Sequence, residues 1–147
     1  MKDTFKIYNN EAFICCIIQN LLSNIKRMDI GRLFILTAFL LQDKIITDRL
    51  IYTNPSIINY ITSNPRKLTS FSRIFEELTP LILNSLTLLC ETDDIKLDIN
   101  NLVIVNHKFK KVSSQRLSQI NIYIPLMISQ IENVSSKQLY DTLKIKL

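Results

Sequence analysis

Few residues of this chain have the types and spacing that catalysis needs. The most suggestive group is Asp94-Ile95-Lys96, because many metal-dependent nucleases end their active-site motif with an acidic residue, any residue and lysine. That chemistry needs a further carboxylate to hold Mg²⁺, and Asp93 and Asp98 are close by. A match over three residues is common by chance, and acidic residues also keep a turn soluble. A small nuclease is therefore the weakest of three functional hypotheses.

Nucleophilic catalysis and zinc binding would both depend on His107, the only histidine. No G-x-S-x-G or comparable nucleophile setting accompanies it. Cys15 and Cys16 are neighbours on a predicted helix, where their side chains point about 100° apart, and a zinc site would need both together with Cys90 and His107. We therefore expect no catalytic residue and no metal site. The three cysteines are interpreted as small hydrophobic residues of a protein in the reducing cytoplasm.

Nucleotide binding through the common phosphate loops is also excluded. Such loops need several glycines so that backbone N–H groups can approach the anion. Gly31 is the only glycine, and neither G-x-x-x-x-G-K-[ST] nor G-x-G-x-x-G occurs. We expect no cofactor.

The net charge of +5 is concentrated in the last third of the chain. Residues 1–105 carry 11 Lys or Arg and 11 Asp or Glu, whereas residues 106–147 carry 7 basic and 2 acidic residues. Lys108, Lys110, Lys111 and Arg116 lie closest together, and they are the candidate contacts with DNA or with an acidic partner surface. An ordinary solvated surface would explain the same residues.

The elements that must position these residues are mostly helices. Leu33–Leu41 is apolar except for Thr37, so the helix predicted over Gly31–Lys44 should be surrounded by other elements. It is too short to span a membrane, which takes about 20 residues. Asp29 should cap it. Residues 1–8 are expected to form an arm, followed from Asn9 or Asn10 by a helix through Ala12–Ile25.

Two short helices are predicted next, over Ile45–Ile51 and Ser56–Ser63, and then a long one from Arg66 to about Glu91. Pro80 should kink or split the long helix, because proline removes a hydrogen bond and clashes with the preceding turn. In that case Thr79 would cap its second half.

Residues 94–106 change period from 3.6 to 2, which predicts a β-hairpin with Asn100-Asn101 as its turn. This turn places Ile99 opposite Leu102 and Leu97 opposite Ile104. Residues 113–147 should then form closing helices. The first begins at Ser113 or Ser114 and is interrupted at Pro125, and the second begins with a capping box between Ser135 and Gln138.

The order of elements predicts a single domain over residues 1–147 that is mainly α with one β-hairpin. It consists of an N-terminal arm (1–8), a helical core (9–92), the hairpin (94–106) and closing helices (113–147). Helices followed by a hairpin form a winged-helix-like arrangement. An apolar fraction of 47% with 21% charged residues is typical of a folded protein.

Winged helices that bind DNA usually present a basic helix and a basic wing. Here Arg66, Lys67 and Arg73 lie on the helix before the hairpin, but acidic residues follow them. These are Glu76, Glu77, Glu91, Asp93, Asp94 and Asp98. An acidic wing would repel phosphate and favours protein docking, while a stand-alone winged-helix DNA-binding regulator is the alternative hypothesis.

The order of segments also resembles a known family. Asn10-Glu11-Ala12-Phe13 leads into an apolar helix, and Leu36–Lys44 reads LTAFLLQDK. A short helical segment (Leu50–Tyr60), an Asn-Pro junction (Asn64-Pro65), a long helix from near Phe71 and the closing stretch Ile124–Ile145 complete the pattern. The whole resembles the middle component of three-component ABC ATPase systems, the small subunit of Lamassu-type defence complexes.

This resemblance implies a non-catalytic accessory subunit of an SMC/Rad50-like ABC ATPase complex in defence against phages or plasmids. Such a subunit would sit on the ATPase and help hold a separate effector, often a nuclease, until foreign DNA is sensed. The implied partners are the ATPase, the effector and, through the complex, DNA. No membrane and no small-molecule substrate is implied.

Overall fold

The computed structural model describes residues 2–42, 65–98, 102–105, 114–131, 134–143 and 145. Its elements, in chain order, are α1 (Lys2–Ile25), β1 (Arg27–Asp29), α2 (Ile30–Leu40), α6 (Pro65–Glu91), β2 (Ile95–Leu97), β3 (Leu102–Val105), α7 (Gln115–Ile131) and α8 (Ser136–Thr142). The prediction of a mainly α fold with a β-hairpin is confirmed. The helices predicted over Ile45–Ile51 and Ser56–Ser63, and the turn Asn100-Asn101, lie outside the described residues.

Strands β1, β2 and β3 form a small antiparallel sheet. Its strand order is β1-β3-β2, so the hairpin β2–β3 is joined on its outer side by β1, which comes from the connection between α1 and α2. Met28 of β1 lies opposite Val103 of β3, and both side chains are buried. The predicted hairpin is present, whereas β1 was not expected.

The predicted hairpin register is wrong by one residue. Leu97 lies opposite Val103, not Ile104, and Lys96 lies opposite Ile104. The period of a strand is two, so a shift of one residue places Val103 on the face that Ile95 and Leu97 share. Val103 and Ile95 are buried on that face, while Leu97, at the strand end, is 53% exposed.

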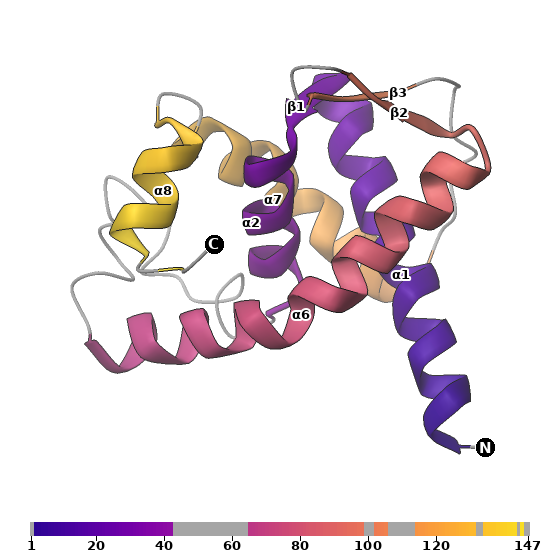
Figure 1. The fold of residues 1–147 in the computed structure, drawn as a ribbon, viewed down its shortest axis with the longest axis horizontal. Coiled ribbons are helices and arrows are strands. Elements are labelled where there is room, and N and C mark those ends of the chain that lie inside the picture. The colour runs from indigo at the N-terminus through magenta and orange to yellow at the C-terminus, as the bar shows by residue number, and fades with distance from the viewer. Residues whose placement is uncertain are drawn as a thin grey trace.

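Helix α2 is the centre of the molecule, as predicted. Every residue from Leu33 to Leu40 is buried, and the helix lies between α6 in front and α7 behind it in Figure 1. The Asp29 carboxylate accepts a hydrogen bond from the Arg32 backbone N–H at 3.1 Å, which confirms Asp29 as the cap. The helix ends at Leu40, before the predicted end at Lys44. Within the described ranges no helix combines the length and the hydrophobicity needed to cross a membrane.

The predicted start of the first helix is wrong. α1 begins at Lys2 and not after Asn9 or Asn10, so the expected arm is itself helical. Figure 1 shows the first turns of α1 extending away from the rest of the fold. From Ile14 onward the helix packs into the core through Ile14, Ile17, Ile18, Leu21 and Leu22.

Both internal prolines lie inside continuous helices. α6 runs through Pro80 and bends about half-way along its length in Figure 1, which confirms a kink but not a split. Thr79 does not cap a second helix, because its hydroxyl donates to the Phe75 carbonyl at 2.7 Å. α7 likewise continues through Pro125, contrary to the predicted interruption. Ser114 caps α7, its hydroxyl accepting from the Leu117 N–H, and the capping box of Ser135 and Gln138 is present.

Thr37 is the one buried polar side chain of α2, and it leads to a prediction about stability. Its hydroxyl is fully buried and has no hydrogen-bond partner. Because an unpaired buried hydroxyl carries a desolvation cost, Thr37→Val is expected to raise the free energy of unfolding by about 1 kcal/mol. Urea denaturation measures this change. Thr87→Val, at an exposed position of α6, is the control and should stay within about 0.5 kcal/mol of the wild type. Destabilisation by Thr37→Val would contradict the prediction.

Candidate partner-binding surface

Helix α6 occupies the position of the recognition helix, immediately before the hairpin. One side of it packs against α1 and α2 through Phe71, Phe75, Ile82, Ser85, Leu86 and Leu89. The other side faces solvent and carries two large apolar residues, Leu83 (51% exposed) and Leu88 (41% exposed). We call the exposed residues Glu76, Glu77, Leu83, Leu88 and Glu91 the α6 face.

The charges around the α6 face are predominantly negative. From Glu76 to Asp98 the chain has six carboxylates and a single cation, Lys96, a net charge of 1 − 6 = −5. The cations of α6, Arg66, Lys67 and Arg73, all lie in its first nine residues. The C-terminal part of α6 and the start of the hairpin therefore repel a phosphate backbone and attract a basic surface.

Of the four cations predicted to contact DNA or a partner, the structure describes only Arg116; Lys108, Lys110 and Lys111 lie outside the described residues. Arg116 is exposed near the start of α7, and its guanidinium carbon lies 4.5 Å from the centre of the Phe13 ring on α1. A guanidinium over an aromatic ring is attracted by the ring quadrupole. Arg116 thus helps to join α1 to α7.

The nuclease-like residues do not form a metal-binding group. The half-buried Asp94 carboxylate accepts a hydrogen bond from the Thr92 hydroxyl at 2.7 Å, and Lys96 is exposed on β2. Within the described part of the chain, no three His, Cys, Asp or Glu side chains lie close enough together to hold a metal ion. Through this bond Asp94 stabilises the turn that leads from α6 into the hairpin.

Cys15 and Cys16 have the properties of packing residues, whereas Cys90 is exposed. Cys15 donates a weak hydrogen bond from Sγ to the Ser85 carbonyl at 3.5 Å, and burial raises the pKa of its thiol to about 11. Burial also raises the pKa of Cys16 and of Cys90. Because the thiolate is the reactive form, a raised pKa disfavours nucleophilic chemistry at neutral pH.

A polar contact that the sequence did not reveal joins α1 to α6. Glu11 is 9% exposed, and its carboxylate accepts a hydrogen bond from the Asn84 side-chain amide at 3.3 Å. The buried Ser85 hydroxyl is within hydrogen-bond distance of the Leu81 carbonyl at 2.8 Å and of the Glu11 carbonyl at 3.3 Å. These bonds set the position of α6, and hence of the α6 face, against α1.

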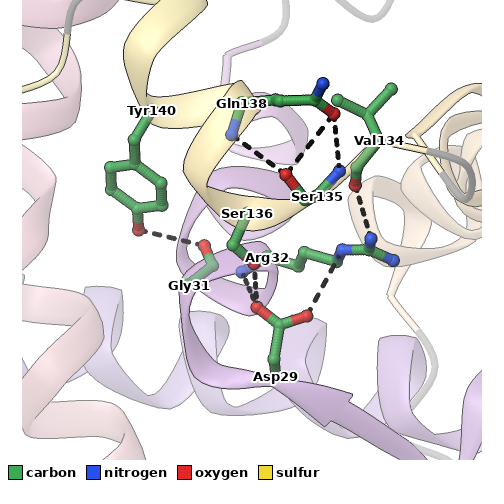
Figure 2. Close-up of polar contacts among 8 residues, drawn as sticks. All are labelled: Asp29, Gly31, Arg32, Val134, Ser135, Ser136, Gln138 and Tyr140. Carbon is green, nitrogen blue, oxygen red and sulfur yellow. Dashed lines mark hydrogen bonds and ion pairs between the residues drawn. The ribbon is translucent and has the colours of Figure 1, made fainter.

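A second polar group fastens α8 to the start of α2 (Figure 2). The Asp29 carboxylate, which caps α2, also accepts a hydrogen bond from the Ser136 hydroxyl and lies 3.3 Å from Arg32 Nε. The Arg32 guanidinium donates to the Val134 carbonyl, just before α8. The Tyr140 hydroxyl donates to the Gly31 carbonyl at 3.0 Å. Burial, together with the nearby Asp29 charge, raises the pKa of Tyr140 to about 12, so this donor stays protonated at neutral pH.

Gly31 allows this close approach of α8. A Cβ atom at position 31 would lie 3.2 Å from Cε2 of Tyr140 and 3.3 Å from Cβ of Ser136. The only glycine of the chain is therefore used for helix packing, since a larger residue would push α8 away from α2.

Aromatic rings continue this connection through the core. Phe39 of α2 stacks on Phe71 of α6 with 4.5 Å between ring centres, and Phe71 is followed by Phe75 at 6.1 Å. Phe75 meets the Tyr140 ring edge-on at 6.0 Å. A hollow of about 970 Å³ opens beside Phe75 and Tyr140, between α2, α6 and α8. Its rim carries Glu76, Asp141 and Lys137, charges of both signs that do not select one kind of ligand.

Comparison with protein-family models, with curated proteins and with solved structures finds no match to this chain.

Proposed function

We propose that this protein is a non-catalytic accessory subunit of an SMC/Rad50-like ABC ATPase complex. In this role it works in the cytoplasm, in defence against phages or plasmids, and links the ATPase to an effector nuclease. The α6 face is the surface that meets a protein partner. The identity of the complex comes from the resemblance of the segments between Asn10 and Ile145 to the middle components of three-component ABC ATPase systems.

The observation that carries the docking role is the negative charge of the stretch from Glu76, in the middle of α6, to Asp98 in the hairpin. Six carboxylates and one lysine lie between Glu76 and Asp98, on the surface where a DNA-binding winged helix places its cations. Leu83 and Leu88 are exposed among these acids. Exposed apolar side chains on an acidic stretch complement a partner surface that is apolar and basic, so the expected partner surface carries Lys or Arg together with apolar side chains.

The alternative function is a stand-alone winged-helix DNA-binding regulator. It is favoured by Arg66 and Lys67 in the first turn of α6 and by Arg73 two turns later. Its signature is tight, salt-dependent binding of DNA by the isolated chain.

A pull-down from the native operon tests the two functions against each other. The tagged chain is purified at physiological salt, and co-eluting proteins are identified by mass spectrometry. Recovery of a large SMC-like ATPase and an effector at fixed stoichiometry supports the accessory subunit. Recovery of the chain alone, combined with DNA mobility shifts at the same salt, would overturn it in favour of the regulator.

Leu83→Lys is expected to reduce recovery of the ATPase at least tenfold. The substitution removes an exposed apolar contact and adds a cation opposite a basic partner. Loss of a hot-spot residue at the centre of an interface costs about 2 kcal/mol or more, roughly a thirtyfold change in affinity. Ser23→Lys adds the same charge at an exposed position on α1 and should leave recovery unchanged. If α6 instead meets DNA, Leu83→Lys should strengthen DNA binding, an outcome opposite in sign.

A further inference from the structure

The first three turns of α6 differ in charge from the rest of the helix. Residues 65–75 contain three cations, Arg66, Lys67 and Arg73, and no carboxylate. The carboxylates of α6 begin at Glu76. One helix therefore has a basic N-terminal part and an acidic C-terminal part, and the α6 face proposed to meet a protein partner lies in the acidic part.

Four polar residues of the basic part share one side of the helix. Arg66, Thr69, Ser70 and Arg73 are all exposed. At 3.6 residues per turn, their spacing keeps them within about 100° of one another around the helix axis. The buried ring of Phe71 lies on the opposite side. The four residues thus form a polar stripe that points away from the core.

A hollow of about 410 Å³ lies along this stripe. Its lining, as far as the structure describes it, consists of Pro65 and the four residues of the stripe, and we call it the basic hollow. The volume is within the range of about 300–1,000 Å³ that is common for ligand sites. The Thr69 hydroxyl already donates to the Pro65 carbonyl at 2.9 Å. The two guanidinium groups and the Ser70 hydroxyl are further donors, and a set of cationic donors selects an oxyanion.

Arg73 can bind such an anion without losing an ion pair. Glu76 and Glu77 follow it by three and four residues, the spacing at which ion pairs form on a helix. With the described residues Arg73 nevertheless forms no ion pair, and it is exposed. Its charge is therefore balanced by none of the carboxylates that the structure describes.

We propose that the basic hollow binds the phosphate backbone of double-stranded DNA without reading its sequence. A guanidinium binds a phosphate through two parallel hydrogen bonds, and a serine hydroxyl is a common further donor. Arg66 and Arg73 are seven residues apart, about 10 Å along the helix axis, so together they reach more than one phosphate of a chain. In winged helices the helix before the hairpin approaches DNA with its N-terminal residues, which here are the basic ones.

The acidic part of α6 restricts how DNA can lie against the helix. If the whole helix lay in the major groove, Glu76 and Glu77 would be placed between two rows of phosphates that repel them. Only the first three turns can approach DNA, so the contact is with the backbone and not with the base edges. A membrane surface is disfavoured, because a helix that lies on a membrane inserts its apolar side, and the apolar side of these turns is buried through Phe71 and Phe75.

The expected binding is weak and depends on salt. Three cations that neutralise phosphates contribute a slope of about −2.7 to a plot of log affinity against log salt, so a rise from about 50 to 200 mM salt weakens the contact about fortyfold. Contacts of this kind have dissociation constants of about 10⁻⁴–10⁻⁶ M at physiological salt. The inference goes beyond the proposed function and does not depend on it. It also differs from the stand-alone regulator, which binds DNA tightly and by its sequence.

Fluorescence anisotropy of the full chain with two labelled DNA duplexes of unrelated sequence tests the proposal. Titrations over a range of salt concentrations give both the affinity and the salt slope. Arg73→Gln should weaken binding to both duplexes about tenfold at about 50 mM salt and make the slope less steep by about 0.9. Basic residues outside the hollow add to the slope of the whole chain, so the difference between variants is the quantity compared.

Two further variants serve as controls. Arg27→Gln removes the same charge from an exposed residue of β1, which lies away from the first turns of α6 in Figure 1, and should leave the slope unchanged. Arg73→Lys keeps the charge, so it should keep the slope and lose less affinity than Arg73→Gln. Circular dichroism checks that all variants are folded.

Four outcomes would overturn the proposal. The first is wild-type affinity and slope in Arg73→Gln, and the second is an equal loss in Arg27→Gln, which would indicate attraction by net charge alone. The third is a tenfold or greater preference for one duplex. The fourth is binding to phosphatidylserine vesicles that Arg73→Gln abolishes while DNA binding is unchanged, which would assign the hollow to a membrane surface. None of these results affects the native pull-down, and a pull-down without an ATPase would leave the DNA contact intact.

Discussion

Phe39→Ala should lower the free energy of unfolding by about 3–5 kcal/mol, the largest effect we expect from any single substitution in this chain. Phe39 is fully buried in α2 and stacks on Phe71 of α6, so the truncation removes the ring and leaves a cavity between the two helices. Chemical denaturation monitored by circular dichroism measures the change. Because a small domain is stabilised by only 5–15 kcal/mol in total, a large part of the variant population should unfold well below the wild-type melting temperature.

Leu83→Ala is the control for this experiment. Leu83 lies on α6, one of the two packed helices, and the substitution shortens an apolar side chain that is half exposed. Its effect should stay within about 0.5 kcal/mol. A loss of less than about 1 kcal/mol for Phe39→Ala would mean that α2 is not the centre of the core.

Asp29→Ala is expected to cost about 2–4 kcal/mol, the second-largest effect. One carboxylate caps α2, which is worth about 1 kcal/mol, and also accepts a charge-assisted hydrogen bond from Ser136, worth about 1.5–3 kcal/mol. The ion pair between Asp29 and Arg32 adds little, because the Asp29 side chain is 32% exposed and the Arg32 side chain 26% exposed, so water screens their attraction. Thermal and urea unfolding of the variant measure the total loss in the free energy of unfolding.

Asp141→Ala on α8 separates this effect from a general loss of negative charge. Asp141 is exposed, and its removal should change the free energy of unfolding by less than about 0.5 kcal/mol. If Asp29→Ser keeps the cap but not the bond to Ser136, it should recover about 1 kcal/mol of the loss. Equal stability of Asp29→Ala and the wild type would contradict the joint role of this carboxylate.

The parts of the fold that were predicted correctly are those with a strong local signal. The uninterrupted apolar run of Leu33–Leu41 has no polar side, so its burial follows from the sequence alone. The same is true of the caps at Asp29 and Ser135, where a side chain and a nearby backbone N–H are close along the chain. The acidic residues that lead into the hairpin were also visible, because their number depends on composition and not on geometry.

Strand β1 gave no such signal. It has three residues, two of them charged, and its turn from α1 uses Lys26 at φ 60°, a conformation that residues other than glycine and asparagine seldom adopt. Its partner β3 lies more than 70 residues further along the chain. The hairpin register failed for a related reason: an Asn-Asn pair permits a two-residue turn, but contact of Val103 with the core decides which residues pair.

Long-range polar contacts were missed because they depend on packing. Nothing in the sequence indicates that Asn84 reaches Glu11, or that Ser136 reaches Asp29 over 107 positions.

The connection between α8 and α2 also determines how α8 exchanges its amide hydrogens. Helices shorter than about 12 residues are marginal in water, and α8 has 7, so it exists as a helix only while Tyr140, Ser136 and Arg32 hold it in place. Its amides are therefore protected from exchange only as long as it stays docked, and they open as one cooperative unit. The amide exchange rate of α8 thus measures how often α8 separates from α2 while the rest of the fold stays intact.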